Sequence, residues 1–219
     1  MIDNVLKDYK YVKTYNRSKD VPQSVIDDLL QRTWKVTPSK NNFMPYKLHV
    51  LGPQHQDLKD KVYEKALKHQ DDQDHLIVPS LKLPRFHNIV SCHYLLIFTQ
   101  RVEDQPNAHQ QELIALGRNY TQTDPNKLGE HYGNAMLEIG MFCNTFAGLC
   151  IESKMDISYT LCFPKQLDQW QDDGFEFLDQ VPIFIMTAGK AQTYLQDEYT
   201  KKELLDLRPN YDRIVDFVK

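Results

Sequence analysis

The chain has 219 residues, of which 41% are hydrophobic and 26% charged, and its formal net charge is -4 at pH 7. This composition is typical of a soluble globular domain, and the acidic balance gives no general footprint for nucleic acid. Glu138 and Asn144 interrupt the longest apolar region, 135–151, so we expect no membrane span, and the polar opening Met1–Asn4 leads us to expect no signal peptide and a cytoplasmic protein.

The first predicted elements are a helix and a strand joined by a polar turn. After Val21-Pro22, apolar residues recur at helical spacing up to Trp34, and Tyr46, Leu48 and Val50 then alternate as in a half-buried strand. The turn between them carries the hydroxyl and amide groups of Ser39, Asn41 and Asn42, which suit a flat ring with both donors and acceptors. The aromatic side chains Trp34, Phe43 and Tyr46 are interpreted as core residues.

Further elements follow in a regular order. The spacing predicts a helix over 55–69, a buried strand over 94–98, a loop over 101–107 and a short helix over 110–116. The stretch 134–151 is apolar on most sides, which indicates a central buried helix or a helix at a subunit interface. Glycines at 133, 140 and 148 would let another backbone approach this helix closely.

Several other chemistries lack their sequence signatures. The four cysteines, at 92, 143, 150 and 162, form no Cys-x-x-Cys pair and are interpreted as inert thiols. The acidic run 71–75 is interpreted as a solvated loop, and no metal site is assigned. Neither a glycine-rich phosphate loop nor a Gly-x-Ser-x-Gly elbow is present, so a bound nucleotide phosphate must be held by side chains.

The turn carries a resemblance to a known family. The pattern Pro-Ser-x-x-Asn-x-Gln-Pro-Trp after an amino-terminal helix belongs to the nitroreductase family of FMN-dependent oxidoreductases, and 38–46 resembles it, reading Pro38-Ser39-Lys40-Asn41-Asn42-Phe43-Met44-Pro45-Tyr46. The segments 10–15, 138–149, 181–189 and 207–209 are similar to further family segments in the same order. The resemblance implies an α+β fold in which helices surround a mixed, mainly antiparallel sheet of four or five strands.

The resemblance also implies a domain layout and a set of flavin-binding residues. One nitroreductase-like domain would cover 1–219, with a variable lid at about 101–131 and a carboxy-terminal arm at about 190–219. Lys10, Lys13 and Arg208 would hold the FMN phosphate, and Tyr11 stands where the family has a serine. The remaining positions that the resemblance assigns to the flavin are Ser39, Asn42, Met44, Arg85 and Asn88. Backbone of 156–162 would pass near the flavin, and no catalytic side chain is named because the cofactor carries the chemistry.

The implied activity is transfer of electrons from NAD(P)H through FMN to a small oxidised acceptor such as a nitroaromatic or a quinone. The implied assembly is a homodimer with two FMN sites, each built from both subunits. Three alternatives remain open: other flavin chemistry on the same fold, such as a flavin-consuming synthase or a reductive dehalogenase, a non-enzymatic flavin-binding protein, and an interaction protein without flavin.

Overall fold

The computed structural model describes residues 10–71, 86–119, 121, 131–171, 173–194 and 213–215. Its centre is a four-stranded antiparallel sheet in the order β2-β3-β5-β4. The strands of this sheet are β2 (Tyr46–Leu51), β3 (Tyr94–Gln100), β4 (Asp156–Thr160) and β5 (Pro182–Gly189). A second, two-stranded antiparallel sheet pairs β1 (Val12–Tyr15) with β6 (Ala191–Tyr194). The α+β prediction with a four-stranded sheet is confirmed, and every strand pair in the described residues is antiparallel.

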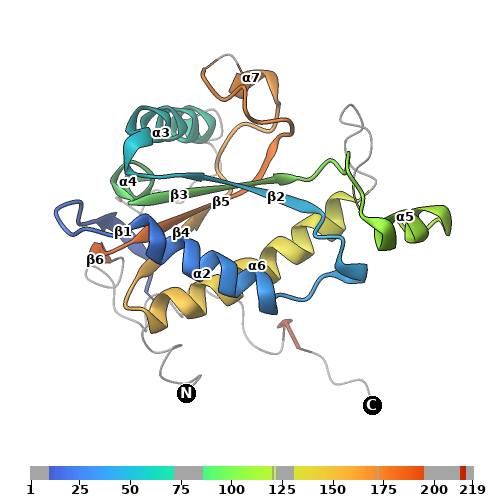
Figure 1. The fold of residues 1–219 in the computed structure, drawn as a ribbon. Coiled ribbons are helices and arrows are strands. Elements are labelled where there is room, and N and C mark those ends of the chain that lie inside the picture. Colours follow the sequence, from blue (N-terminus) through green and yellow to red (C-terminus); the bar gives the residue numbers. More distant parts are fainter. Residues whose placement is uncertain are drawn as a thin grey trace.

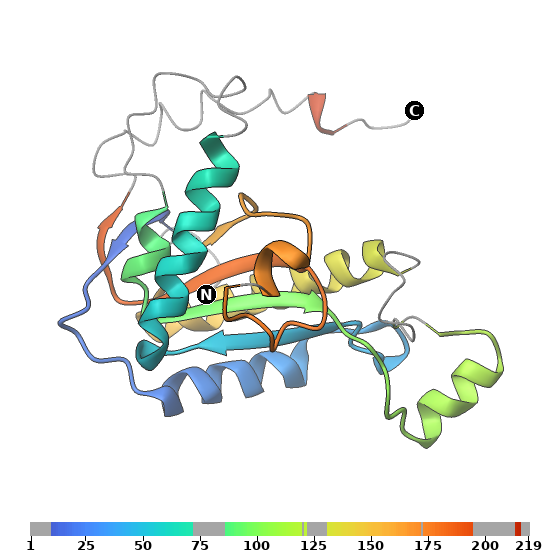
Figure 2. The same cartoon turned by 90° about the horizontal axis from the view of Figure 1, so that it is seen from above.

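Helices cover both faces of the larger sheet (Figure 1). On one face lie α2 (Gln23–Val36) and α6 (Tyr132–Glu152), and on the other lie α3 (Gln56–Asp71), α4 (His87–Ser91) and α7 (Asp168–Gln171). Short 3-10 turns occupy Lys40–Asn42 and Pro53–His55. The helix α5 (Ala108–Ala115) projects beyond the end of the sheet, as the view from above shows (Figure 2).

The side chains of β3 point alternately to the two faces of the sheet and so belong to two separate core clusters. Tyr94, Leu96 and Phe98 pack with side chains of α2 and α6, whereas Leu95 and Ile97 pack on the opposite face with side chains of α3, α4 and α7. Successive side chains of a strand point to opposite faces, so a strand covered by helices on both sides is apolar at every core position. This explains why all seven residues of β3 are buried.

The helix α6 is half core and half surface. Among the described helices it is long and apolar enough to cross a membrane, but its buried face packs on the sheet and on α2, as in a core helix. Its opposite face is exposed, with Leu137 65% accessible. The glycines 133, 140 and 148 are the positions at which the sequence predicts a close backbone approach, yet a Cβ atom built at any of them would meet nothing within 4 Å in this chain.

Two predictions about individual side chains have different outcomes. Phe43 and Tyr46 are buried as expected, but the interpretation of Trp34 as a core residue is wrong, because its side chain is 58% exposed near the end of α2. All four cysteines are free, and only Cys162 is partly accessible. Burial raises the pKa of Cys92 and of Cys143 to about 12, so both thiols stay protonated, as inert thiols should.

Candidate flavin site

The turn between α2 and β2 has an unusual backbone. Asn41, Asn42 and Met44 all adopt positive φ angles, of 54°, 55° and 48°. Asparagine tolerates this left-handed conformation because its short side chain bonds locally, whereas for an ordinary L residue it costs about 1–2 kcal/mol. The conformation of Met44 is therefore imposed by contacts outside its own residue.

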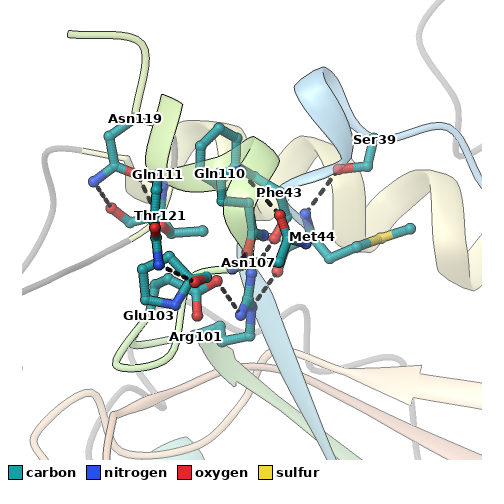
Figure 3. A network of polar contacts seen from close by, with 11 residues as sticks. Ser39, Phe43, Met44, Arg101, Glu103, Asn107, Gln110, Gln111, Asn119 and Thr121 are labelled. Atoms are coloured by element: carbon teal, nitrogen blue, oxygen red, sulfur yellow. Dashed lines mark hydrogen bonds and ion pairs between the residues drawn. The ribbon is translucent and has the colours of Figure 1, made fainter. Parts of the chain in front are cut away.

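Two side chains supply those contacts. The Oγ atom of Ser39 accepts a hydrogen bond of 2.8 Å from the backbone N–H of Met44, which closes the turn from inside. From outside, the guanidinium of Arg101 donates to the carbonyl oxygens of Phe43 and Met44, the latter bond measuring 2.8 Å from Nε (Figure 3). Ser39 is a residue that the sequence singles out, whereas Arg101 lies at the start of the segment predicted as a loop and as a variable lid at about 101–131.

A buried carboxylate of α6 lies under the start of the same turn. Glu138 is 3% exposed, and its Oε1 atom accepts a hydrogen bond of 3.0 Å from the backbone N–H of Lys40. Its Oε2 atom has no hydrogen-bond partner among the described residues. Burial, and to a lesser degree the charge of Glu138, raises the pKa of Tyr46 above its usual range, so its phenol is protonated and can donate.

An apolar groove of about 340 Å³ adjoins the turn. It lies between α2, the start of β2 and α6, and is lined by Leu30, Gln31, Trp34, Met44, Tyr46, Leu48 and Phe142. Gln31 is the one amide in this lining, and the Met44 side chain stands where the family pattern has glutamine. The side chain of Asn42, on the same turn, is exposed.

The basic residues near the amino terminus belong to another part of the molecule. Lys10 is exposed, with its Nζ atom 4.9 Å from the centroid of the Tyr194 ring, while Lys13 is buried within β1. Tyr11 is partly buried, and burial raises its pKa although a hydrogen bond to Ser158 acts in the opposite direction. Because β1 contacts β4, these two lysines and the phenol of Tyr11 come from a segment that lies beside β4.

Asn88 joins the same group. It is buried in α4, and its Nδ2 atom donates a hydrogen bond of 2.9 Å to the Oγ atom of Ser158 on β4. Tyr11 and Asn88, predicted from distant parts of the sequence, therefore meet at one hydroxyl. Ser158 has no local motif that marks it, and it lies in the segment predicted to pass near the flavin by its backbone.

The predicted residues consequently form two groups. Ser158 on β4 pairs with Thr187 on β5, which pairs with Leu95 on β3, which in turn pairs with Leu51 at the end of β2. The turn precedes Tyr46, at the other end of β2. Because β2 and β4 are opposite edges of the sheet, the two groups occupy diagonally opposite corners, roughly 20 Å apart by strand geometry. Arg85 and Arg208 lie outside the described residues.

Comparisons with known proteins bear on the fold. No protein-family model matches the sequence, and no curated protein matches it. Among solved structures, a candidate nitroreductase from Exiguobacterium sibiricum in complex with FMN is similar to this chain at a TM-score of 0.67 and 13% identity, covering 100% of this chain and 97% of that one.

Two further structures agree. A nitroreductase-like protein from Streptococcus mutans has a TM-score of 0.63 and 13% identity, with 100% of this chain and 98% of that chain covered. A candidate NAD(P)H:FMN oxidoreductase from Staphylococcus epidermidis has a TM-score of 0.61 and 16% identity, with 100% and 96% covered. At these identities the likeness concerns the backbone arrangement, and it extends over the whole chain: the protein has the nitroreductase fold.

Proposed function

We propose that this protein is an FMN-dependent oxidoreductase that passes electrons from NAD(P)H to a small oxidised acceptor such as a nitroaromatic or a quinone. The observation that carries the proposal is the turn at 39–44, where the motif residues of a flavin-binding family sit on a nitroreductase fold with their backbone fixed and Asn42 exposed. The fold similarity to an FMN complex supports it.

The residues present fit the two ends of FMN. The group beside β4 contains two lysines, a phenol, an amide and a hydroxyl, which suits a phosphate and a polyhydroxyl chain. A carboxylate next to them, Asp156 at the start of β4, already accepts hydrogen bonds from the Tyr194 hydroxyl and the Ala191 backbone N–H. In this proposal Lys10 and Lys13 hold the phosphate together with Arg208, while Tyr11, Asn88 and Arg85 bind nearby. Ser39, Asn42 and Met44 form the other wall, against the ring.

The diagonal separation of the two groups favours a site shared between two chains. A homodimer would bring the turn of one chain to the β4 corner of the other, so that each FMN is held by both. The exposed face of α6 supports this assembly, because Tyr132, Met136 and Leu137 form an apolar surface around glycines that leave room for a neighbouring backbone. The expected cellular location of this dimer is the cytoplasm.

The redox chemistry, transfer of electrons from NAD(P)H to the acceptor, would be supplied by bound FMN. The protein's own groups bind and orient it. The lysines neutralise the phosphate charge, Asn42 bonds a polar atom of the ligand to fix its position, and the protonated phenols of Tyr11 and Tyr46 offer neutral donors. The apolar groove offers a surface beside Met44 on which a flat ring could pack.

Flavin binding and reduction test the proposal. Purified protein titrated with FMN should bind it, the bound flavin should bleach with NADH or NADPH under anaerobic conditions, and a panel of nitroaromatics and quinones should restore the colour. Binding without bleaching would favour the non-enzymatic flavin-binding alternative. Absence of binding would favour the interaction protein.

Asn42→Leu keeps the side-chain volume but leaves flavin polar atoms without a partner, and it also places an ordinary L residue at a φ of 55°, which costs about 1–2 kcal/mol. The change should weaken FMN binding by about 1–3 kcal/mol. Gln111→Leu, which removes an exposed amide on α5, is the matched control and should leave affinity unchanged. Equal FMN affinity in both variants would reduce Asn42 to a turn residue.

A further inference from the structure

The left-handed turn at 39–44 is held mainly by one residue from outside it. Three successive carbonyl groups are bound by Arg101: its side chain donates to the oxygens of Phe43 and Met44, and its backbone N–H donates to that of Pro45 at 3.1 Å. The planar fork of a guanidinium can bridge two neighbouring carbonyl oxygens, which a lysine ammonium cannot do with the same geometry.

The guanidinium is itself held by an acid. Its Nη1 atom lies 2.5 Å from Oε2 of Glu103, whose side chain is only 3% exposed, while that of Arg101 is 26% exposed. Figure 3 shows the arrangement, with Arg101 between Glu103 on one side and the backbone of Phe43 and Met44 on the other. A charge pair with one partner almost fully desolvated fixes the direction of the arginine more firmly than a surface pair would.

We propose that Arg101 is a positioning residue for the flavin site, which it sets through the backbone of the turn, and that Glu103 orients its guanidinium. The inference rests on the proposed function, since the turn carries Ser39, Asn42 and Met44. Arg101 fixes Met44 in the left-handed conformation that this residue does not favour, and by bonding the carbonyl of Phe43 it also holds the chain directly after Asn42. Neither Arg101 nor Glu103 needs to touch the ligand.

Arg101→Met tests the first step by removing the bonds to both carbonyls while keeping the aliphatic stem. Backbone amides of residues 39–44 should exchange hydrogen with solvent at least about tenfold faster, and FMN affinity should fall by about 10-fold or more, as expected for the loss of hydrogen bonds from a charged donor. Arg101→Lys should show most of the same increase in amide exchange and most of the same decrease in FMN affinity. Glu103→Gln should change both measurements in the same direction by a smaller factor. Arg32→Met, which removes an exposed arginine of α2, is the matched control and should change neither measurement.

A comparison at position 44 distinguishes positioning from general stabilisation. Met44→Gly and Met44→Ala both remove the thioether, but only glycine adopts a positive φ without cost. The fold-loss of FMN affinity caused by Arg101→Met should therefore be several-fold smaller in the Met44→Gly background than in the Met44→Ala background. Equal losses in the two backgrounds would overturn the proposal, and so would wild-type exchange rates in Arg101→Met.

The two proposals fail in different ways. If the wild-type protein binds no FMN, the proposed function is wrong. Amide exchange in the flavin-free protein still decides whether Arg101 holds the turn. The Met44→Gly and Met44→Ala backgrounds can then be compared by their amide exchange rates. If Arg101→Met does not fold, Arg101→Lys and Glu103→Gln carry the same comparison. Wild-type exchange in both of these milder variants would count against the proposal.

Discussion

At the scale of single residues, two histidines sit in places that disfavour their charged form. His93 is buried at the start of β3, where its Nε2 atom lies 2.5 Å from the carbonyl oxygen of Lys19, and a Cβ atom added at Gly189 would overlap with its ring. Burial lowers the pKa of His93, and the charges of Lys59 and Arg17 add to the effect, while the hydrogen bond to Lys19 and the charge of Asp20 oppose it. Burial and Lys47 lower the pKa of His49 on β2, against a smaller effect of Asp179.

These shifts predict that stability falls as the pH is lowered. Below about pH 6.5 the unfolded chain binds protons at both histidines, whereas the folded chain does not. The contribution of the two neutral histidines to the free energy of unfolding is therefore fully present above about pH 6.5. It is lost as the pH falls towards the lowered pKa values of the folded state. Chemical denaturation at about pH 7.5 and about pH 5.5 should show a lower free energy of unfolding at the acidic pH. Each histidine can contribute at most about 1.4 kcal/mol for every unit by which its folded-state pKa lies below its unfolded-state pKa. His49→Gln should flatten this dependence and His109→Gln, on the exposed side of α5, should not. Stability that stays constant or rises over this interval would contradict the prediction.

At the scale of elements, a buried lysine joins α3 to the junction of α4 and β3. The Nζ atom of Lys59 donates to the carbonyl oxygens of Cys92 and His93, at 3.0 and 2.9 Å, and the residue is 1% exposed. These carbonyls lie where α4 ends and β3 begins, at a junction that leaves backbone acceptors to be satisfied by side chains. Burial lowers the pKa of Lys59, although Cys92 and Asp60 act in the opposite direction.

Lys59→Met should therefore be destabilising. It fills the same space but leaves two buried carbonyl oxygens without their donor, which costs about 1–3 kcal/mol. Lys61→Met is the control on the same helix, because its Nζ bonds the carbonyl of Asp173 at an exposed site, and its effect should stay within about 0.5 kcal/mol. Urea denaturation of both variants measures the difference, and equal free energies of unfolding would show that Lys59 is not a structural donor.

At the scale of the whole molecule, the two groups of proposed flavin residues lie at opposite corners of one sheet. A single chain presents each group on a different side, so each would be half of a site. Two chains related by a twofold axis would complete two sites at once. Dimerisation and cofactor binding would then be linked, since FMN would bind the dimer and stabilise it by mass action.

Complementation between variants tests this arrangement. Asn42→Leu damages the turn and Lys13→Ala damages the phosphate group, so each homodimer should bind FMN weakly. In a mixed dimer, one of the two sites would combine the intact turn of one chain with the intact lysine of the other, and the second site would carry both substitutions. Mixed dimers can be made by unfolding and refolding an equal mixture of the two variants. About half of the sites in these mixed dimers should then bind FMN with wild-type affinity. Flavin fluorescence titration measures this recovery. No recovery on mixing, or a monomer in sedimentation that binds FMN with full affinity, would exclude the shared site.

The parts that sequence could predict are those with a strong local pattern. The helices α2, α3 and α6 and the strands β2 and β3 follow from the apolar spacing of their own residues. The strand β5 follows from the resemblance of 181–189 to a family segment, and Ser39 and Asn42 follow from a compact motif. The strands β1 and β6 could not be found this way, because their pairing joins residues such as Thr14 and Thr193 across 179 positions and their sequences are short and polar. Ser158 and Arg101 were missed for a similar reason, since each acquires its role from contacts with distant residues.

The division of the core by the sheet affects how the sequence can change. The backbone of the strands separates the side chains of the two clusters. A change of side-chain volume on one face therefore requires compensating changes on the same face. Substitutions on opposite faces should then act nearly additively on stability, and one layer can be rebuilt in small steps while the other keeps the strands in register. This is a physical route by which chains that share only 13–16% of their residues can retain a common architecture.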